Sequence, residues 1–185
     1  MQPRSPQPSV RAWFASRGWT PNAFQAETWA AYLAGGDGLV QAPTGMGKTF
    51  AALGGAVDEA LNSPPGPRGV RVVWLAPIRA LAKEIESSAA SLLAGVGLDW
   101  QVGIRTGDTP PSERARQRLQ LPEVLITTPE SLHLLFCQAD HAKRFATCAL
   151  LVVDEWHALL GTKRGVQVEL AAAHLKRVSP NCRTW

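Results

Sequence analysis

The stretch Ala42-Pro43-Thr44-Gly45-Met46-Gly47-Lys48-Thr49 limits the possible folds of this chain more than any other part of the sequence. Residues 39–41 before it have the composition of a short buried strand, and residues 48–61 after it carry apolar side chains at helical spacing. A glycine-rich turn between a strand and a helix directs several backbone N–H groups at one small volume, where they can hold anionic oxygens. We therefore predict a phosphate-binding loop.

The residue types within this loop suit a polyphosphate with a divalent cation. Gly45 and Gly47 carry no Cβ, so the backbone can approach the phosphates closely. Lys48 supplies a mobile positive charge for the β- and γ-phosphates, and the Thr49 hydroxyl is a ligand for Mg²⁺. The pattern departs from G-x-x-x-x-G-K-[ST] at Ala42. The alternative, a chance Gly-Lys-Thr in an ordinary loop, is disfavoured by the strand and the helix that flank it.

A second candidate site follows an apolar stretch later in the chain. Residues 150–153 are Leu-Leu-Val-Val, and Asp154-Glu155-Trp156-His157 come directly after them. Two adjacent acids at a strand end, in a domain with a phosphate loop, suggest divided roles. We expect Asp154 to hold Mg²⁺, directly or through water, and Glu155 to orient and deprotonate the attacking water. The alternative is a solvated acidic turn.

The apolar patterns elsewhere predict alternating strands and helices. Strands are expected at residues 70–76, 100–104, 124–127 and 149–153. Helices are expected at residues 10–17, from a Thr20 N-cap to Gly35-Gly36, at residues 78–93 and 112–119, after a Thr128-Pro129 cap, and along Val166, Leu170 and Ala173. Connections of this length favour a mostly parallel sheet covered on both faces. We predict a RecA-like three-layer α/β/α sandwich of the P-loop NTPase class, with ligands at the carboxyl ends of the strands.

Length and composition narrow the class of protein further. A chain of 185 residues, 45% of them hydrophobic, is expected to form one domain. The net charge of +4 favours a polyanionic partner. Cys137, Cys148 and Cys182 show no metal or disulfide spacing, and no apolar run is long enough to span a bilayer. We expect a protein of a reducing cytosol, with no membrane association.

Both ends of the chain differ from its middle. Residues 1–9 contain Pro3, Pro6 and Pro8 and are expected to form a flexible arm, so the folded domain is predicted at residues 10–185. Residues 180–185 resemble a turn that leads into a further strand. We therefore expect the sequence to be a fragment of a longer protein.

At these positions the sequence resembles the superfamily 2 helicases of the DEAH/DExH type. Residues 42–49 are similar to their motif I and residues 154–157 to their motif II. Gln25, preceded by Gly18-Trp19 and Pro21, resembles the Q motif, which reads adenine. Further similarities lie at residues 76–81 (motif Ia), 106–108 and 128–132, where the family contacts a nucleic-acid strand. The resemblance implies ATP and Mg²⁺ as cofactors and covers almost the whole chain.

Within this superfamily, the Asp-Glu-x-His motif and residues 161–165 resemble the large helicase-related (Lhr) family. Trp156 and residues 105–108 are most similar to its bacterial branch of ligase-associated DNA damage response helicases. This resemblance implies the first RecA-like motor domain of a 3′→5′ DNA translocase in repair, in the bacterial cytosol or nucleoid. Its expected partners are single-stranded or tailed duplex DNA and repair proteins such as a DNA ligase or nuclease. His157 is implied to link motif II to a motif III that this sequence does not contain.

The nucleic-acid candidates also have a physical basis. Hydroxyl and backbone N–H groups at strand ends contact phosphates without reading bases, as a motor that steps along any sequence requires. Thr128 has the alternative of a plain N-cap, and Arg79 that of a surface pair with Glu84. The candidates are Arg79, Thr106, Gly107, Thr128 and Pro129, with Arg105 and Lys163 as further ones.

The roles of several aromatic and polar side chains can each be interpreted in two ways. Gln25 has a donor and an acceptor for the adenine edge, or it is a plain exposed helical residue. Trp13, Phe14 and Trp19 stack on the base or, more simply, pack in the core. Three histidines form no partner pattern and are expected to be structural or exposed: His133, His141 and His174.

Three functions remain open at this level. The first is an ATP-dependent DNA motor, and the second is an RNA helicase on the same scaffold, since backbone contacts discriminate poorly between the two sugars. The third is a nucleotide-dependent clamp without turnover, which the presence of Lys48, Thr49, Asp154 and Glu155 disfavours for the whole protein. For residues 1–185 alone we expect weak binding and hydrolysis near background, because the resemblance implies that a second motor domain supplies arginine fingers.

Overall fold

The computed structural model describes residues 8–43, 45–76 and 79–185, and its centre is one parallel β-sheet. The strands are β1 (Val72–Leu75), β2 (Val102–Arg105), β3 (Val124–Thr127), β4 (Leu150–Val153) and β5 (Arg183–Thr184). They lie side by side in the order β2-β3-β1-β4-β5, and every neighbouring pair is parallel. The predicted strands are thereby confirmed at residues 70–76, 100–104, 124–127 and 149–153, each within two or three residues of its bounds.

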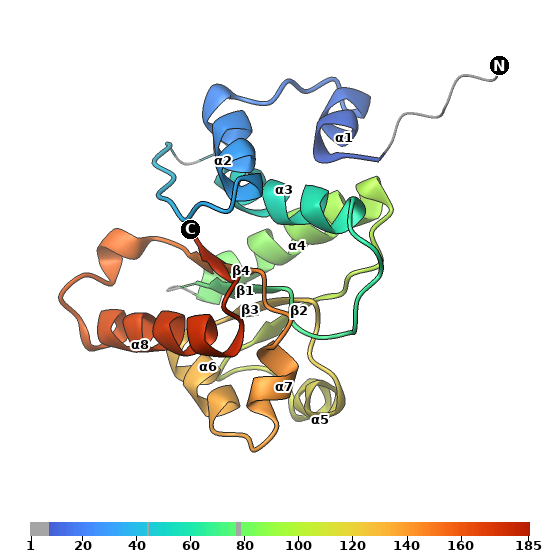
Figure 1. The fold of residues 1–185 in the computed structure, drawn as a ribbon. Helices are drawn as coiled ribbons and strands as arrows, with labels where there is room; N and C mark the ends of the chain where they lie inside the picture. Colours follow the sequence, from blue (N-terminus) through green and yellow to red (C-terminus); the bar gives the residue numbers. More distant parts are fainter. Residues whose placement is uncertain (1–7, 44, 77–78) are drawn as a thin grey trace.

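Helices cover both faces of this sheet, which confirms the three-layer RecA-like fold (Figure 1). One layer contains α1 (Val10–Ser16), α2 (Ala23–Leu33), α3 (Lys48–Leu61) and α4 (Arg79–Val96). The other side holds α6 (Pro129–Phe136), α7 (His141–Phe145) and α8 (Lys163–Val178), with α5 (Pro111–Leu119) between β2 and β3 in the chain. A 3₁₀ turn, η1 (Trp156–Ala158), follows β4. None of the helices in the described ranges is long and apolar enough to cross a bilayer.

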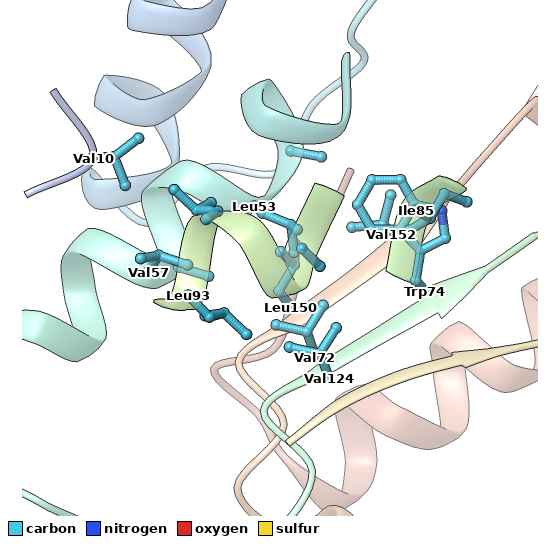
Figure 2. Close-up of a cluster of buried hydrophobic side chains, with 14 of the residues drawn as sticks. Val10, Leu53, Val57, Val72, Trp74, Ile85, Leu93, Val124, Leu150 and Val152 are labelled. Carbon is cyan, nitrogen blue, oxygen red and sulfur yellow. The ribbon is translucent and has the colours of Figure 1, made fainter. Parts of the chain in front are cut away.

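The side chains of β1, β3 and β4 alternate between two cores. In β1, Val72 and Trp74 pack with the α1–α4 layer, whereas Val73 and Leu75 pack with the α6–α8 layer. Figure 2 shows the first core, in which Leu53 of α3 and Leu93 of α4 approach the strand residues. Because both faces are covered, all four residues of β1 are buried, as the continuous apolar run predicted.

The strand predicted at residues 39–41 is wrong. These residues form neither helix nor strand, and the Leu39 side chain is 77% exposed. The chain passes β5 just before this point, where the Gly38 N–H donates to the Thr184 carbonyl and the Thr184 N–H donates to the Asp37 carboxylate. Among the described residues, no backbone hydrogen bond involves residues 39–41, so the apolar composition there is not matched by strand pairing.

Two helix predictions also need correction. The second helix starts at Ala23 with Asn22 as its N-cap, so Thr20 is not the cap; the Gln25 side chain accepts from the Asn22 N–H and fixes the start there. The last helix forms as predicted, but Val166, Leu170 and Ala173 lie on its exposed face. Its packed face carries another row at the same spacing: Gly165, Val168, Ala171 and Leu175. Helix α7 was not predicted.

Candidate functional site

The loop before α3 has the backbone of an anion site. Gly45 (φ 82°) and Gly47 (φ 80°) lie in the left-handed region, which other residues rarely adopt. Gly47 is the N-cap of α3 and offers no side chain to the first turn, so the N–H groups at this helix start keep no side-chain acceptor. The positive end of the helix dipole is therefore open to an anion. Thr44 lies outside the described residues, while Ala42 and Pro43 are irregular and Met46 is exposed.

The carboxyl end of β4 brings the acidic pair to the same place. The Lys48 ammonium lies 3.6 Å from a Glu155 carboxylate oxygen, so the phosphate loop and the acids meet as the sequence predicted. Glu155 has φ 50°, and no other non-glycine residue in the described ranges has a positive φ. Such a conformation costs free energy and persists where the surroundings impose it, which is typical of functional sites.

Asp154 accepts two hydrogen bonds. The Trp74 indole N–H donates to its Oδ2 at 3.4 Å, and the Glu155 backbone N–H donates to its Oδ1 at 3.0 Å. Burial raises the pKa of Asp154 above its ordinary value; the Trp74 hydrogen bond opposes this, and the Glu155 charge adds to it. A partly desolvated carboxylate beside a second acid favours a cation in the site.

These residues fit Mg²⁺ as a small protein-ligand set. Within the described part of the chain, no cluster of three or more His, Cys, Asp or Glu side chains could hold a metal ion. Mg²⁺ is commonly held by one or two protein ligands plus substrate phosphates and waters. Asp154 and the half-buried Thr49, in the first turn of α3, are the two groups for that arrangement.

A pocket of about 530 Å³ is lined by Lys48, Asp154 and Glu155. His157 also borders it, with its Nδ1 3.5 Å from Glu155 Oε2 and a side chain that is 79% exposed. The remaining walls are residues 39–42, Trp74, Trp185 and neighbours of the acids. All four predicted catalytic side chains line this one pocket: Lys48, Asp154, Glu155 and His157.

Gln25 is buried, with 2% of its surface exposed, so the interpretation as a plain exposed helical residue is wrong. Its amide nitrogen donates to the Gly47 carbonyl at 3.1 Å, and its amide oxygen accepts from the Asn22 N–H at 2.9 Å. Gln25 thus ties the start of α2 to the last residue of the phosphate loop. Contact with adenine stays a prediction, and it requires these internal bonds to exchange for bonds to the base.

The aromatic candidates divide by exposure. Trp13 and Phe14 are buried and meet Phe50 of α3 edge to face, at ring-centroid distances of 5.3 and 5.8 Å. They therefore pack in the core. Trp19 is 45% exposed beside the same Phe50, so its face remains a candidate for stacking.

The predicted nucleic-acid residues lie along the same edge of the sheet. Arg105 pairs in register with Thr127 across β2 and β3, so Thr106 and Thr128, one residue later, stand at adjacent strand ends. The Ala76 N–H donates to the Thr127 carbonyl, and the Asp154 N–H donates to the Leu75 carbonyl. The edge therefore runs in order through Thr106, Thr128, Ala76 and Asp154.

The loop after β2 is fixed by a residue that the sequence did not single out. The Arg114 guanidinium donates to the carbonyls of Thr109 (2.8 Å), Thr106 (3.2 Å) and Gly107. The Thr106 N–H also donates to the Thr109 hydroxyl at 2.8 Å. The N–H groups of Arg114 thus bind three carbonyls of one turn. The cluster of arginines in α5 was the available signal.

The other candidates have mixed positions. Thr128 caps α6, because its Oγ1 accepts from the Ser131 N–H at 3.3 Å, and Pro129 is the buried first residue of that helix. Lys163 is exposed at the start of α8. The Arg79 backbone begins α4, but its side chain and the proposed pair with Glu84 lie outside what the structure describes.

Three of the histidines, His133, His141 and His174, gather in one place on the other face of the sheet. His133 and His174 flank Phe136, at ring-centroid distances of 6.0 and 4.5 Å, and His141 lies 5.0 Å from His174. His133 and His141 each bond a backbone carbonyl at 2.8 Å. Their packing supports the structural role that was expected.

Comparison with known proteins fixes the family. The sequence profile of the DEAD/DEAH box helicases matches residues 22–184. The chain belongs to this family. It is 37% identical over 180 residues to the Lhr helicase/probable uracil glycosylase of Mycolicibacterium smegmatis, covering 91% of this chain and 12% of that protein. Over 112 residues it is 35% identical to the ATP-dependent RNA helicase DBP3 of Candida glabrata, covering 60% of this chain and 20% of that protein.

A solved helicase has the same fold. The structure of the Mycobacterium smegmatis helicase Lhr bound to ssDNA and AMP-PNP aligns with a TM-score of 0.82 and 36% identity, over 95% of this chain and 24% of that one. This DEAD/DEAH box helicase chain therefore corresponds to one motor domain of a nucleic-acid helicase. It spans about an eighth of the Lhr relative's length.

Proposed function

We propose that this chain is the ATP-binding first motor domain of a DNA translocase that moves 3′→5′ in DNA repair. The observation that carries the proposal is the shared pocket, where Lys48, Asp154 and Glu155 meet beside the open N-terminus of α3. ATP is the proposed substrate of the pocket and Mg²⁺ its cofactor. The relative solved with AMP-PNP and ssDNA supports both ligand classes.

Each group in the pocket has a distinct task in this proposal. The backbone N–H groups of the loop and Lys48 bind and orient the phosphates. Thr49 and Asp154 hold Mg²⁺, which, when bound, neutralises developing charge on the phosphate oxygens. Glu155 accepts the proton of the attacking water, and its contact with Lys48 keeps its carboxylate at the phosphate side of the pocket. Gln25 is proposed to read adenine, and His157 to couple Glu155 to the rest of the motor.

The strand ends beside the pocket are the proposed nucleic-acid track. The loops that begin at Thr106 and Thr128 lie next to each other, and Ala76, the residue after the adjacent β1, separates them from Asp154. This order lets a change at the nucleotide move the phosphate-binding loops through one sheet edge. Arg79, Gly107 and Pro129 complete the track, with Arg105 and Lys163 as outlying charges. Contacts of this kind address phosphates, so binding should ignore base sequence and weaken with salt.

The finer assignment follows the resemblance within the Lhr family. We place the chain in the ligase-associated branch, with repair proteins such as a ligase or nuclease as partners and the bacterial cytosol as its location. RNA is the second candidate substrate, favoured by the similarity to an RNA helicase. A clamp without turnover is the third. By itself this chain should hydrolyse ATP near background, because arginine fingers come from a second motor domain.

A strand-competition ATPase assay tests the proposal. The assay compares this chain alone with a protein that joins it to a second motor domain, each with single-stranded DNA or RNA of matched length. We expect DNA to stimulate the joined protein at least tenfold more than RNA does, and the chain alone to respond little. Stimulation by RNA alone would favour the second candidate. Equal rates with and without the second domain would contradict the two-domain mechanism.

A further inference from the structure

Two buried cysteines lie next to each other far from the nucleotide pocket. The Sγ atoms of Cys148 and Cys182 are 3.7 Å apart, and both are free thiols. Their residues are 1% and 2% exposed, within the core of the α6–α8 layer. Cys148 comes two residues before β4, and Cys182 comes directly before β5.

The backbone at this point suits a cross-link. Leu150 pairs with Arg183, so Cys182 lies opposite Ala149 and one residue from Cys148. Neighbouring strands are about 4.8 Å apart, which together with a one-residue offset keeps the Cα atoms within the usual range for a disulfide. The thiols already face each other across this gap.

We propose that Cys148 and Cys182 form a dithiol site that hydroperoxides convert into a disulfide. This proposal is independent of the nucleotide chemistry. Its nearest competitor in the sequence, Cys137, is exposed and follows α6.

The surroundings assign different roles to the two sulfurs. The hydrogen bond with Cys148 lowers the pKa of the Cys182 thiol, and burial opposes it. The charges of Lys176 and Arg183 also lower this pKa, whereas the charge of Asp37 raises it. The same hydrogen bond, with burial, raises the pKa of Cys148. Lys176 is close, since its ammonium donates to the Cys182 carbonyl at 2.8 Å. With the Lys176 ammonium beside it, Cys182 is the attacking thiolate in this proposal and Cys148 the resolving thiol.

The reaction balances with hydrogen peroxide as the oxidant. The Cys182 thiolate attacks one peroxide oxygen, the O–O bond breaks, and the other oxygen leaves as water after taking up a proton; Cys182 becomes a sulfenic acid. Cys148 then attacks the Cys182 sulfur, the S–S bond forms, and the hydroxyl leaves as water with the Cys148 proton. Two thiols are oxidised while one peroxide is reduced to two waters.

A hollow of about 400 Å³ brings a small oxidant up to the Cys148 side of the site; Cys182 is 2% exposed and does not border the hollow, so attack at its sulfur also requires local opening of β5. Cys148 borders the hollow, and Lys176, Asn181 and Arg183 form other parts of its wall. The positive side chains there also favour the thiolate over the thiol.

A disulfide between Cys148 and Cys182 would restrain β5, whose residues and neighbours contact α3 and the nucleotide pocket. Arg183 makes two hydrogen bonds, of 2.8 and 2.9 Å, to Glu59 of α3, the helix that starts at the phosphate loop. Trp185 lines the nucleotide pocket, and its indole N–H donates to the Gly36 carbonyl at 3.1 Å. A disulfide at the start of β5 removes the opening of this strand from the accessible motions.

The test uses the chain with Cys137→Ser, which removes the exposed thiol and leaves the core intact. The protein is titrated with hydrogen peroxide below its Tm, and the products are identified by intact mass and peptide mapping. We expect loss of two hydrogen atoms, a Cys148–Cys182 peptide, and a Tm higher by roughly 5–10 °C that a reductant reverses. Cys148→Ser and Cys182→Ser in the same background should each remain unlinked.

Three results would overturn the proposal. The first is that both thiols stay free at peroxide doses that oxidise Cys137 in the unsubstituted chain. The second is that either thiol is oxidised to sulfinic acid without formation of a disulfide. Finally, a disulfide that left Tm unchanged would contradict its hold on β5.

Discussion

Two helix starts at the same edge of the sheet are built in opposite ways. Helix α3 begins at Gly47, which has a positive φ and offers no side-chain acceptor to the first turn. Helix α6 begins at Thr128, which has extended backbone and whose hydroxyl accepts from the Ser131 N–H. The first start leaves donors free for an external anion, and the second satisfies a donor internally.

This difference indicates which contacts each site can make. The open start of α3 can hold phosphate oxygens with several N–H groups at once, and Lys48 and the acids lie beside it. The capped start of α6 has fewer groups to offer, so it suits one contact in a long series along a nucleic-acid backbone. Loss of one such contact should matter less than loss of any group at α3.

The largest effect is expected at Lys48. Lys48→Ala removes the cation that lies beside the open helix start, so hydrolysis in a protein with both motor domains should fall at least about 100-fold. Steady-state ATPase assays with saturating DNA measure this. The matched control is Lys163→Ala, an exposed cation at the start of α8, where the capped helix predicts a change of only a few-fold. If the Lys48→Ala variant hydrolysed ATP at nearly the rate of the unsubstituted protein, Lys48 would not be part of the catalytic site.

Gly47 should show the next largest effect, with Gly45 as its matched control. Both glycines have a positive φ near 80°, so alanine at either costs about 1–2 kcal/mol of backbone strain. A Cβ at Gly47 would also lie 2.7 Å from the Gln25 amide nitrogen, whereas a Cβ at Gly45 meets nothing within 4 Å. Gly47→Ala should therefore weaken nucleotide binding roughly tenfold more than Gly45→Ala. Calorimetric titration with AMP-PNP compares the two variants. Equal losses of nucleotide affinity would show that the contact between Gln25 and Gly47 does not affect nucleotide binding.

At Thr128 the expected change is in stability. Thr128→Ala should lower the free energy of unfolding by about 1 kcal/mol, because the Ser131 N–H loses its acceptor, and Thr128→Ser should restore most of it. Urea unfolding of the three proteins measures this. Nucleotide affinity should not change in either variant. A loss of DNA affinity that serine fails to rescue would show that Thr128 contributes more than a cap.

Much of this architecture could be predicted, because it depends on local patterns. The bounds of α3 and β3 match those expected from apolar spacing, and the phosphate loop before α3 and the acids after β4 follow from short motifs. Residues 39–41 were predicted as a strand from composition alone. Strand formation also requires backbone hydrogen bonds to a neighbouring strand, which composition does not display.

The remaining features depend on contacts that the sequence does not display. Helix α8 carries two apolar rows at the same spacing, and only packing against the sheet decides which is buried. Trp74 reaches Asp154 across 80 positions, and Gln25 reaches Gly47 across 22. The Arg114 guanidinium donates to carbonyls of the loop after β2, a contact that the basic composition of α5 does not specify. The positive φ of Glu155 has no sequence signal.

The smallest expected effect is the pH dependence that Asp154 adds. Its pKa is raised in the folded state, so the folded protein binds this proton more tightly than the unfolded chain does, and stability falls as pH rises above the ordinary aspartate pKa of 3.8. At pH 7 the charged carboxylate therefore costs stability. Asp154→Asn should raise Tm slightly at pH 7 and flatten the pH profile just above that pKa, while hydrolysis is lost. A lower Tm for Asp154→Asn at pH 7 would show that its hydrogen bonds outweigh its desolvation.

Glu155→Gln tests the central claim most directly, namely that the open start of α3 binds the nucleotide and the acidic pair hydrolyses it. Glutamine keeps the shape of the side chain and removes the base, while the loop, Lys48 and Asp154 remain. The measurement combines the Kd for ATP with Mg²⁺ and the single-turnover rate in a protein with both motor domains. The account predicts a Kd within a few-fold of the unsubstituted protein and a rate lower by at least about 100-fold. A variant that binds no ATP, or one that hydrolyses it at the original rate, would contradict it.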